Sequence, residues 1–356
     1  MSGVAAAAAR LIRGRDDLRR RGDYPPDLWR GLAEAGLLGL TVPEQYGGRG
    51  RDLEQLADDC RDMVRHGRSL GAMLAWKVHC TLCLFALARL GDEAQKRAWL
   101  PRLATGETTL AAAISEPGAG AHPKYLKARA ERLPDGGWRL DGEKAWITNG
   151  PSAGLFIAVA VKGESGGRKR FGAFLVPADA PGLARTEAGA VEFLRPTGHC
   201  GLSFRDVRLP ASAELGPDAD IWSAFAKPLR NVEDLLKLGS QRGAMEALLD
   251  DAAGAGLDDE VLGGLAARLV SFEALAALPG RDDARLLAAR HQQRDFLAAF
   301  EALELPEDPA RAALIADMKA SESVAGRVHA IRLAALGREA RGAAAADSPA
   351  GAKAIA

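Results

Sequence analysis

The spacing of hydrophobic residues divides the chain into a helical block, a sheet block and a second helical block. Up to about residue 108, apolar residues recur at intervals of three and four, most clearly over 53–65 and 70–90, which predicts amphipathic helices. Pro26 marks the start of another helix, because proline fits the first helical turn. Residues 1–108 are therefore predicted to form an N-terminal helical domain.

Between residues 109 and 216 the pattern changes to short runs rich in Val, Ile, Phe and Trp. Clusters of Gly, Pro, Asn and Asp separate these runs, as expected for strands joined by turns. The pattern predicts a middle antiparallel β domain whose clearest strands are 138–148, 155–161, 171–176 and 202–209.

Helical spacing returns over residues 217–340, with breaks predicted at Pro279-Gly280 and over 305–309. The fold class is therefore α+β, with a C-terminal helical bundle. Residues 341–356 are small and offer little apolar surface, so we expect a flexible tail. The apolar positions over 261–278 predict an interface with the same chain or a related subunit; alternatively, the bundle buries them by itself.

Composition narrows the function classes. Lys plus Arg and Asp plus Glu both number 47 among 356 residues, so no overall charge favours nucleic acid or an anionic membrane. No run of about 18 apolar residues predicts a transmembrane helix. The basic, Ala-rich start reads as a helix, with a transit peptide as the alternative.

The four cysteines are too few and too scattered for a disulfide framework, which favours a cytoplasmic protein. Cys80 and Cys83 have the spacing of a redox or zinc motif. They lie in an apolar helical run without a second ligand pair, so core packing is the favoured interpretation and no metal site is predicted.

Two polar segments at predicted strand ends carry candidate chemistry. The first, 115–120, reads Ser-Glu-Pro-Gly-Ala-Gly, and the second, 146–150, reads Trp-Ile-Thr-Asn-Gly. Glycines let backbone N–H groups approach an anion or a ring, hydroxyls satisfy ring nitrogens and carbonyls, and tryptophan offers a flat face. Taken alone, the first is an ordinary turn and Trp146 an ordinary core residue.

Together the two segments resemble the paired signature of the acyl-CoA dehydrogenases, flavoproteins with a helical, a sheet and a second helical domain. Further segments are similar to family patterns in the family's order, and the resemblance covers roughly residues 20 to 250. These further segments are 42–50, 90–101, 174–177 and 202–207. The resemblance implies an oxidoreductase that uses FAD on an acyl thioester of CoA or acyl carrier protein, with an electron-transferring flavoprotein as a further partner.

The resemblance also implies cofactor contacts. Ile114 and Ser115 match the stretch that meets the flavin's pyrimidine edge, Trp146 matches a residue packed on the isoalloxazine, and Thr148 matches a contact near N5. Gly120 and Ala121 match the turn at the pyrophosphate. Here the chain departs from the family, because Ala121 lacks the usual hydroxyl. His122 is ambiguous, and Lys124 offers either a replacement charge or a solvated side chain.

The last third departs further. The family's Arg-x-x-Phe-Gly segment, Gly-Gly-x-Gly turn and catalytic glutamate have no recognisable counterpart, so the C-terminal domain is expected to be shortened and divergent. Desaturation needs a base for the α proton. The replacement candidates all lie in helical charge patterns, where solvated faces are the simpler interpretation. They are Glu233, Asp234, Glu273, Glu322 and Glu339.

Three hypotheses follow. The first is an acyl-CoA dehydrogenase-like flavoenzyme that desaturates an acyl thioester with an unassigned base. The second is a non-catalytic subunit that pairs with a complete paralogue. The third is a flavin oxygenase or oxidase on the same fold.

Overall fold

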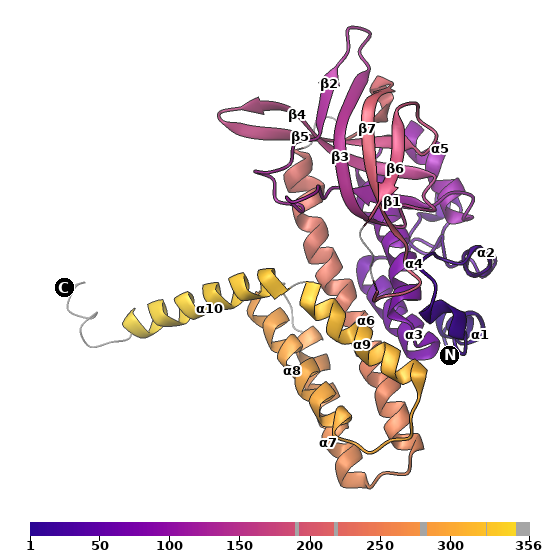
Figure 1. The fold of residues 1–356 in the computed structure, drawn as a ribbon, viewed down its shortest axis with the longest axis vertical. Coiled ribbons are helices and arrows are strands. Elements are labelled where there is room, and N and C mark those ends of the chain that lie inside the picture. The colour runs from indigo at the N-terminus through magenta and orange to yellow at the C-terminus, as the bar shows by residue number, and fades with distance from the viewer. Residues whose placement is uncertain (189–191, 217–219, 278–282, 325, 347–356) are drawn as a thin grey trace. The chain divides into compact units, whose positions relative to one another are not determined.

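Helices come first, a sheet follows and helices return, which confirms the predicted order (Figure 1). The computed structural model describes residues 1–188, 192–216, 220–277, 283–324 and 326–346. Backbone contacts divide the chain into two units, Met1–Ser240 and Gln241–Ala356, and each is described by itself.

The first unit begins with helices that start where the sequence places capping residues. Pro26 opens its helix, and Asp52 and Asp92 each form a capping box with the glutamine three residues later. Ser69 caps a fourth helix through its hydroxyl. The helices are α1 (Gly3–Leu11), α2 (Pro26–Glu34), α3 (Leu53–Gly67), α4 (Leu70–Leu82) and α5 (Glu93–Ala104).

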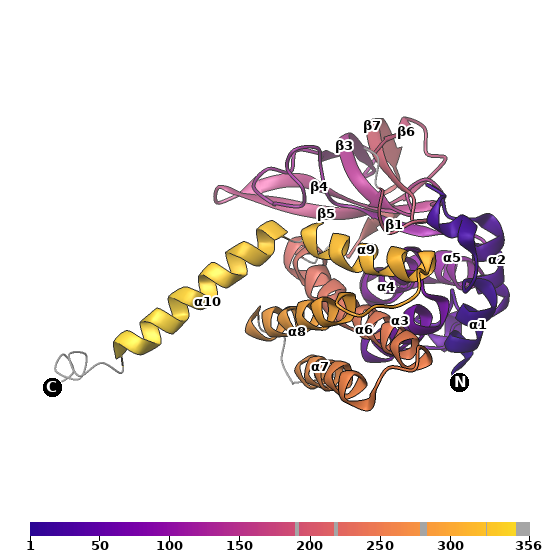
Figure 2. The ribbon, with the colours of Figure 1, turned by 60° about the horizontal axis from the view of Figure 1, so that its bottom comes forward.

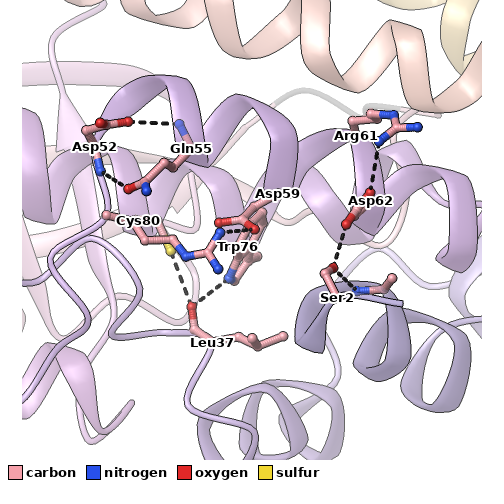
Figure 3. Close-up of polar contacts among 11 residues, drawn as sticks. Ser2, Leu37, Asp52, Gln55, Asp59, Arg61, Asp62, Trp76 and Cys80 are labelled. Atoms are coloured by element: carbon pink, nitrogen blue, oxygen red, sulfur yellow. Dashed lines mark hydrogen bonds and ion pairs between the residues drawn. The ribbon is translucent and has the colours of Figure 1, made fainter.

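Buried polar contacts fix the N-terminal helices against the intervening loops (Figure 3). Trp76 Nε1 donates to the carbonyl oxygen of Leu37 at 2.9 Å, and the Cys80 thiol lies 3.6 Å from the same oxygen. Cys80 and Cys83 are fully buried, and burial raises the pKa of both thiols. The predicted core-packing role of the two cysteines is therefore confirmed.

α4 continues into a π-helical turn, Cys83–Ala88, and both are strongly apolar. The segment Leu70–Ala88 has a mean hydropathy of 1.6, enough in length and composition to span a membrane. However, 83% of this window is buried inside the protein, as in a core helix.

In the sheet of the first unit, β4 pairs with three other strands. The strand order of the sheet is β6-β7-β3-β2-β4-β5-β8, and β1 also pairs with β4. Most pairs are antiparallel, but β4 runs parallel to both β1 and β2, so the sheet is mixed and not purely antiparallel as predicted. The strands are β1 (Leu110–Ala113), β2 (Arg129–Arg132), β3 (Trp138–Thr148), β4 (Leu155–Ser165), β5 (Arg168–Pro177), β6 (Leu183–Glu187), β7 (His199–Leu209) and β8 (Glu214–Leu215).

Residues 155–160 of β4 are buried without interruption, as expected for a strand covered on both faces. Phe156 joins Phe174 of β5 and Leu202 of β7 in one apolar cluster. Successive side chains point to opposite faces, so Leu155 and Ile157 fill the other side. Apolar residues therefore pack on both faces of β4, the strand that pairs with β1.

The second unit is helical and contains the C-terminal part of α6 (Lys227–Gly254). It continues with α7 (Asp259–Ala277), α8 (Asp283–Glu301), α9 (Pro309–Val324) and α10 (Gly326–Ala346). The gap between α8 and α9 confirms the predicted break over 305–309, whereas Pro279-Gly280 lies outside the described residues.

Burial within the unit accounts for only part of the stripe 261–278, and α10 runs further than predicted. Within the stripe 261–278, Leu265, Leu269 and Phe272 are buried in the protein itself, although Val270 is 62% exposed. Residues 341–346 extend α10 where a flexible tail was expected, because their alanines favour helix. The remainder of that tail, 347–356, lies outside the described residues.

His79 of α4 joins this helix to the end of α5 and to the first residue of β1. Its Nε2 lies 3.1 Å from the Leu103 carbonyl oxygen, and its Nδ1 accepts from the Leu110 N–H at 3.2 Å. Nδ1 must therefore be unprotonated and Nε2 must donate. Burial lowers the pKa of His79 to about 4.

We predict that the stability of the first unit falls as the pH is lowered from about 6.5 to about 4. In this window the His79 side chain is protonated in the unfolded chain but stays neutral in the folded protein. The free energy of unfolding therefore falls by up to about 3 kcal/mol. His79→Gln should reduce this slope while costing stability at neutral pH. Urea unfolding followed by tryptophan fluorescence measures it, since all six tryptophans lie within Met1–Ser240. An equal slope in the variant would show that His79 does not cause it.

Candidate functional site

The chain leaves β1 at Ile114 and immediately forms a tight turn. The N–H of Glu116 donates to the Gly120 carbonyl at 3.0 Å, and the N–H of Gly120 donates back to Glu116 at 3.0 Å. Gly118 and Gly120 have φ of 70° and 55°, and neither has an atom near the place of a Cβ. The turn is therefore open to solvent at its two glycines.

β3 reaches the same region with an interrupted register. Its pairing with β7 shifts between Lys144 and Ile147, so the intervening residues form a bulge, which re-aims side chains. Within it Trp146 has φ of 59°, a strained value for tryptophan, and is 53% exposed. The predicted core role of a lone tryptophan does not hold here, because the bulge presents the indole to solvent.

A direct hydrogen bond joins the first segment of the sequence signature to the residue that precedes the second. The N–H of Ala145 donates to the Ser115 carbonyl at 2.9 Å, so Ile114 and Ser115 lie beside the bulge that carries Trp146. β1 and β3 lie close together in both views (Figure 1 and Figure 2). The structure thus brings together the residues predicted for the flavin ring.

A buried ion pair lies beneath this junction. Lys144 Nζ is 2.8 Å from Glu116 Oε1 and also donates to the Ile114 carbonyl at 3.1 Å. The sequence reading treated Glu116 only as part of a turn and did not single out Lys144. No local signal could have found the pair, because its members are 28 residues apart.

Thr148 has a partner that the sequence reading also missed. Its Oγ1 lies 3.2 Å from Nε2 of His199, which sits opposite it in the β3–β7 register. Burial lowers the pKa of His199, which favours the neutral imidazole. A neutral ring can accept from the Thr148 hydroxyl or donate to it, which leaves the other half of the hydroxyl's capacity for a ligand.

The segment after the turn is exposed and packs on itself. The His122 ring lies 4.9 Å from that of Tyr125, and Lys124 Nζ is 5.8 Å from the Tyr125 ring centroid. Ala121 is exposed at the end of the turn. Lys124 is itself exposed, which agrees with a solvated side chain, and it has the Tyr125 ring as a neighbour.

The carboxylate candidates differ in their surroundings. Glu273 accepts from Arg242 at 2.8 Å and Glu322 from Arg294 at 2.8 Å, both within the second unit. Glu233 lies in the first unit; although part of its side chain is exposed, desolvation raises the pKa of its carboxyl, and the nearby Lys77 ammonium opposes that rise.

The surroundings of the remaining two candidate bases give no sign of a catalytic role. Asp234 already has a partner, and Glu339 is exposed on α10 in the second unit. Glu233 is thus the candidate for which desolvation raises the pKa.

Comparison with known families decides the classification. The family models "Acyl-CoA dehydrogenase, N-terminal domain" and "Acyl-CoA dehydrogenase, middle domain" match residues 4–107 and 111–207. The chain belongs to the acyl-CoA dehydrogenase family. Both segments of the paired signature lie within the middle-domain match.

Relatives agree with this assignment. The mitochondrial isovaleryl-CoA dehydrogenase of Oryza sativa subsp. japonica is 33% identical over 231 residues, which cover 64% of this chain and 56% of that protein. The chain spans about half the length of the curated acyl-CoA dehydrogenases it matches.

Solved structures share the fold of this family member. Butyryl-CoA dehydrogenase from Megasphaera elsdenii superposes with a TM-score of 0.75 at 21% identity, over 94% of this chain and 98% of that chain. Glutaryl-CoA dehydrogenase from Mycobacterium smegmatis, in complex with FADH2, gives a TM-score of 0.74 at 22% identity, over 90% and 89%.

The left-handed backbone at Trp146 generates a prediction about stability. A non-glycine residue in this conformation costs about 1–2 kcal/mol, which glycine avoids. Trp146→Gly should therefore have a free energy of unfolding about 1 kcal/mol higher than that of Trp146→Ala, the matched control. Urea unfolding followed by the remaining tryptophans compares them. A more stable alanine variant would mean that the bulge holds no such strain.

Proposed function

We propose that this chain binds FAD at the junction of β1 and β3 and desaturates the acyl group of an acyl thioester. The observation that carries the proposal is the exposed Trp146, presented by a strained bulge that is hydrogen-bonded to Ser115. A large aromatic side chain held in the open by a strained backbone is expected where a ligand covers it.

The residues present suit a flavin. Trp146 offers a stacking face, the Thr148 hydroxyl offers a hydrogen bond, and the open glycine turn gives backbone N–H groups access to a phosphate. When bound, FAD supplies the hydride acceptor for the reaction. The residues that would hold it are Ile114, Ser115, Gly120, Ala121, Trp146 and Thr148.

We propose Glu233 as the general base that removes the α proton. A base needs a pKa near the working pH, and desolvation moves the carboxyl of Glu233 in that direction. Lys77 of α4 limits the shift through its positive charge. Desolvation and the charge of Lys77 therefore act on the pKa of Glu233 in opposite directions.

The acyl carrier is proposed to be CoA, as the names of the matched relatives suggest. An electron-transferring flavoprotein would reoxidise the cofactor. We also propose a cytoplasmic homo- or hetero-oligomer associated through the C-terminal helices, where Val270 of α7 and Ile331 of α10 expose apolar surface.

Thr148→Ala should weaken FAD binding or lower the flavin's reduction potential. The substitution removes a hydroxyl proposed to stabilise the reduced ring and leaves His199 without its partner. Titration with FAD and dye-coupled reduction measure both quantities. Thr186→Ala, at an exposed position of β6, is the control and should change neither. Equal affinity and potential in both variants would remove Thr148 from the site.

The reaction itself is tested by mixing the FAD-loaded chain with acyl-CoA under anaerobic conditions. We expect the flavin absorbance to bleach, and Glu233→Gln to slow bleaching by about a hundred- to ten-thousand-fold while FAD stays bound. Lys77→Met should shift the acid limb of the pH–rate profile upward, because it removes the charge that lowers the pKa of Glu233.

Two results would contradict this function. A chain that stays colourless with FAD would favour a non-catalytic subunit. A flavin that acyl-CoA cannot bleach, but that reacts with oxygen after chemical reduction, would favour an oxygenase or oxidase.

A further inference from the structure

We propose that Glu116 and Lys144 act together as a positioning pair that holds the β1–β3 junction in its flavin-binding geometry. This inference rests on the proposed cofactor and adds two residues to it. Neither side chain is available to touch a ligand, because 7% of the Glu116 side chain and 1% of that of Lys144 are exposed. Their role must act through the backbone that they hold.

The pair connects four segments of backbone. Lys144 lies on β3 and donates to the Ile114 carbonyl, which is the last group before the glycine turn. The Glu116 carboxylate accepts from the N–H of Lys127 at 2.6 Å and of Ala128 at 2.9 Å, at the approach to β2. Both ends of the segment 116–128 are thus fastened to one carboxylate.

Each member of the pair depends on the other. Burial lowers the pKa of Lys144, and the hydrogen bond to Glu116 opposes that effect. Removing one partner leaves the charge of the other buried without compensation. This destabilises the protein more than replacing both members by apolar residues of similar volume. A buried pair adds little net stability over apolar residues, so its use here is better explained by the geometry that it specifies.

One member of the pair, Lys144, lies close to the proposed flavin contacts in the sequence of β3. Lys144 precedes by one residue the N–H that binds the Ser115 carbonyl, and by two the strained Trp146. A shift of the ammonium group would therefore move the Ile114 carbonyl and the bulge together. The pair sets the distance between the two halves of the proposed ring site.

A second buried pair in the same sheet provides a matched control. Lys162 Nζ of β4 lies 2.6 Å from Glu214 Oε1 of β8, and 11% and 5% of their side chains are exposed. Breaking this pair also removes a close partner from a buried charge, although Arg132 Nη1 stays 4.0 Å from Glu214 Oε2. It does not involve the β1–β3 junction.

The experiment is a double-mutant cycle on FAD affinity. Lys144→Met, Glu116→Gln and the double variant are titrated with FAD as apo chains, beside Lys162→Met and Glu214→Gln. We expect each single variant at the junction to raise the Kd about tenfold or more, and the charge-balanced double variant to recover at least half of that loss on a logarithmic scale. The control variants should unfold at lower urea concentration but stay within about twofold of the original Kd.

The reduction potential adds a readout that a purely structural role would not move. In Lys144→Met the Ile114 carbonyl loses its donor, so the contacts proposed to stabilise the reduced ring should weaken and the bound flavin should become harder to reduce. The double variant should return toward the original potential. Glu116→Gln preserves side-chain volume and is the milder of the two single changes.

The outcomes separate this inference from the proposed function. If the unsubstituted chain binds FAD and both single variants bind it equally well, the inference fails and the function stands. It fails equally if the control pair weakens FAD binding as much, or if the double variant recovers nothing. If the unsubstituted chain binds no FAD, the cofactor assignment and this inference fail together.

Discussion

A carboxylate and an ammonium group buried together between β1 and β3 are the constraint on which the candidate site depends. Charges removed from water must satisfy each other and the nearby backbone, and Glu116 and Lys144 do this with the carbonyl of Ile114 and two N–H groups. The glycine turn, the end of β1 and the start of β2 cannot move independently. A loop that would otherwise adopt many conformations is therefore preorganised.

The conformation of the bulge in β3 depends on these fixed surroundings. Trp146 occupies a backbone region that tryptophan avoids, and such strain persists only where the surroundings determine the conformation. The buried Lys144 on one side and Asn149, which donates from its amide to the Ala75 carbonyl at 2.7 Å, on the other fix both ends of the bulge. The exposed indole is thus a consequence of firmly held neighbours, and it gives the site its stacking surface.

The sequence alone predicted the order of the three blocks, the helix starts at Pro26, Leu53 and Leu70, and the two segments proposed to form the site. It could do so because capping residues, periodic apolar positions and glycine-rich turns act locally. It could not predict the Glu116–Lys144 pair, the contact of Thr148 with His199 or the parallel pairing of β1 with β4, because each joins residues distant in sequence. The sequence did not predict the helical end of α10, because small residues bury little apolar surface; the alanines of 341–346 nevertheless have a high helix propensity.

The most direct test of this account is an experimentally determined structure of the chain with FAD bound. The account predicts the isoalloxazine ring against Trp146, its pyrimidine edge along Ile114 and Ser115, and N5 near the Thr148 hydroxyl, with the Glu116–Lys144 ion pair intact beneath it. A flavin bound elsewhere, or a junction whose ion pair has opened to admit the ring, would contradict it.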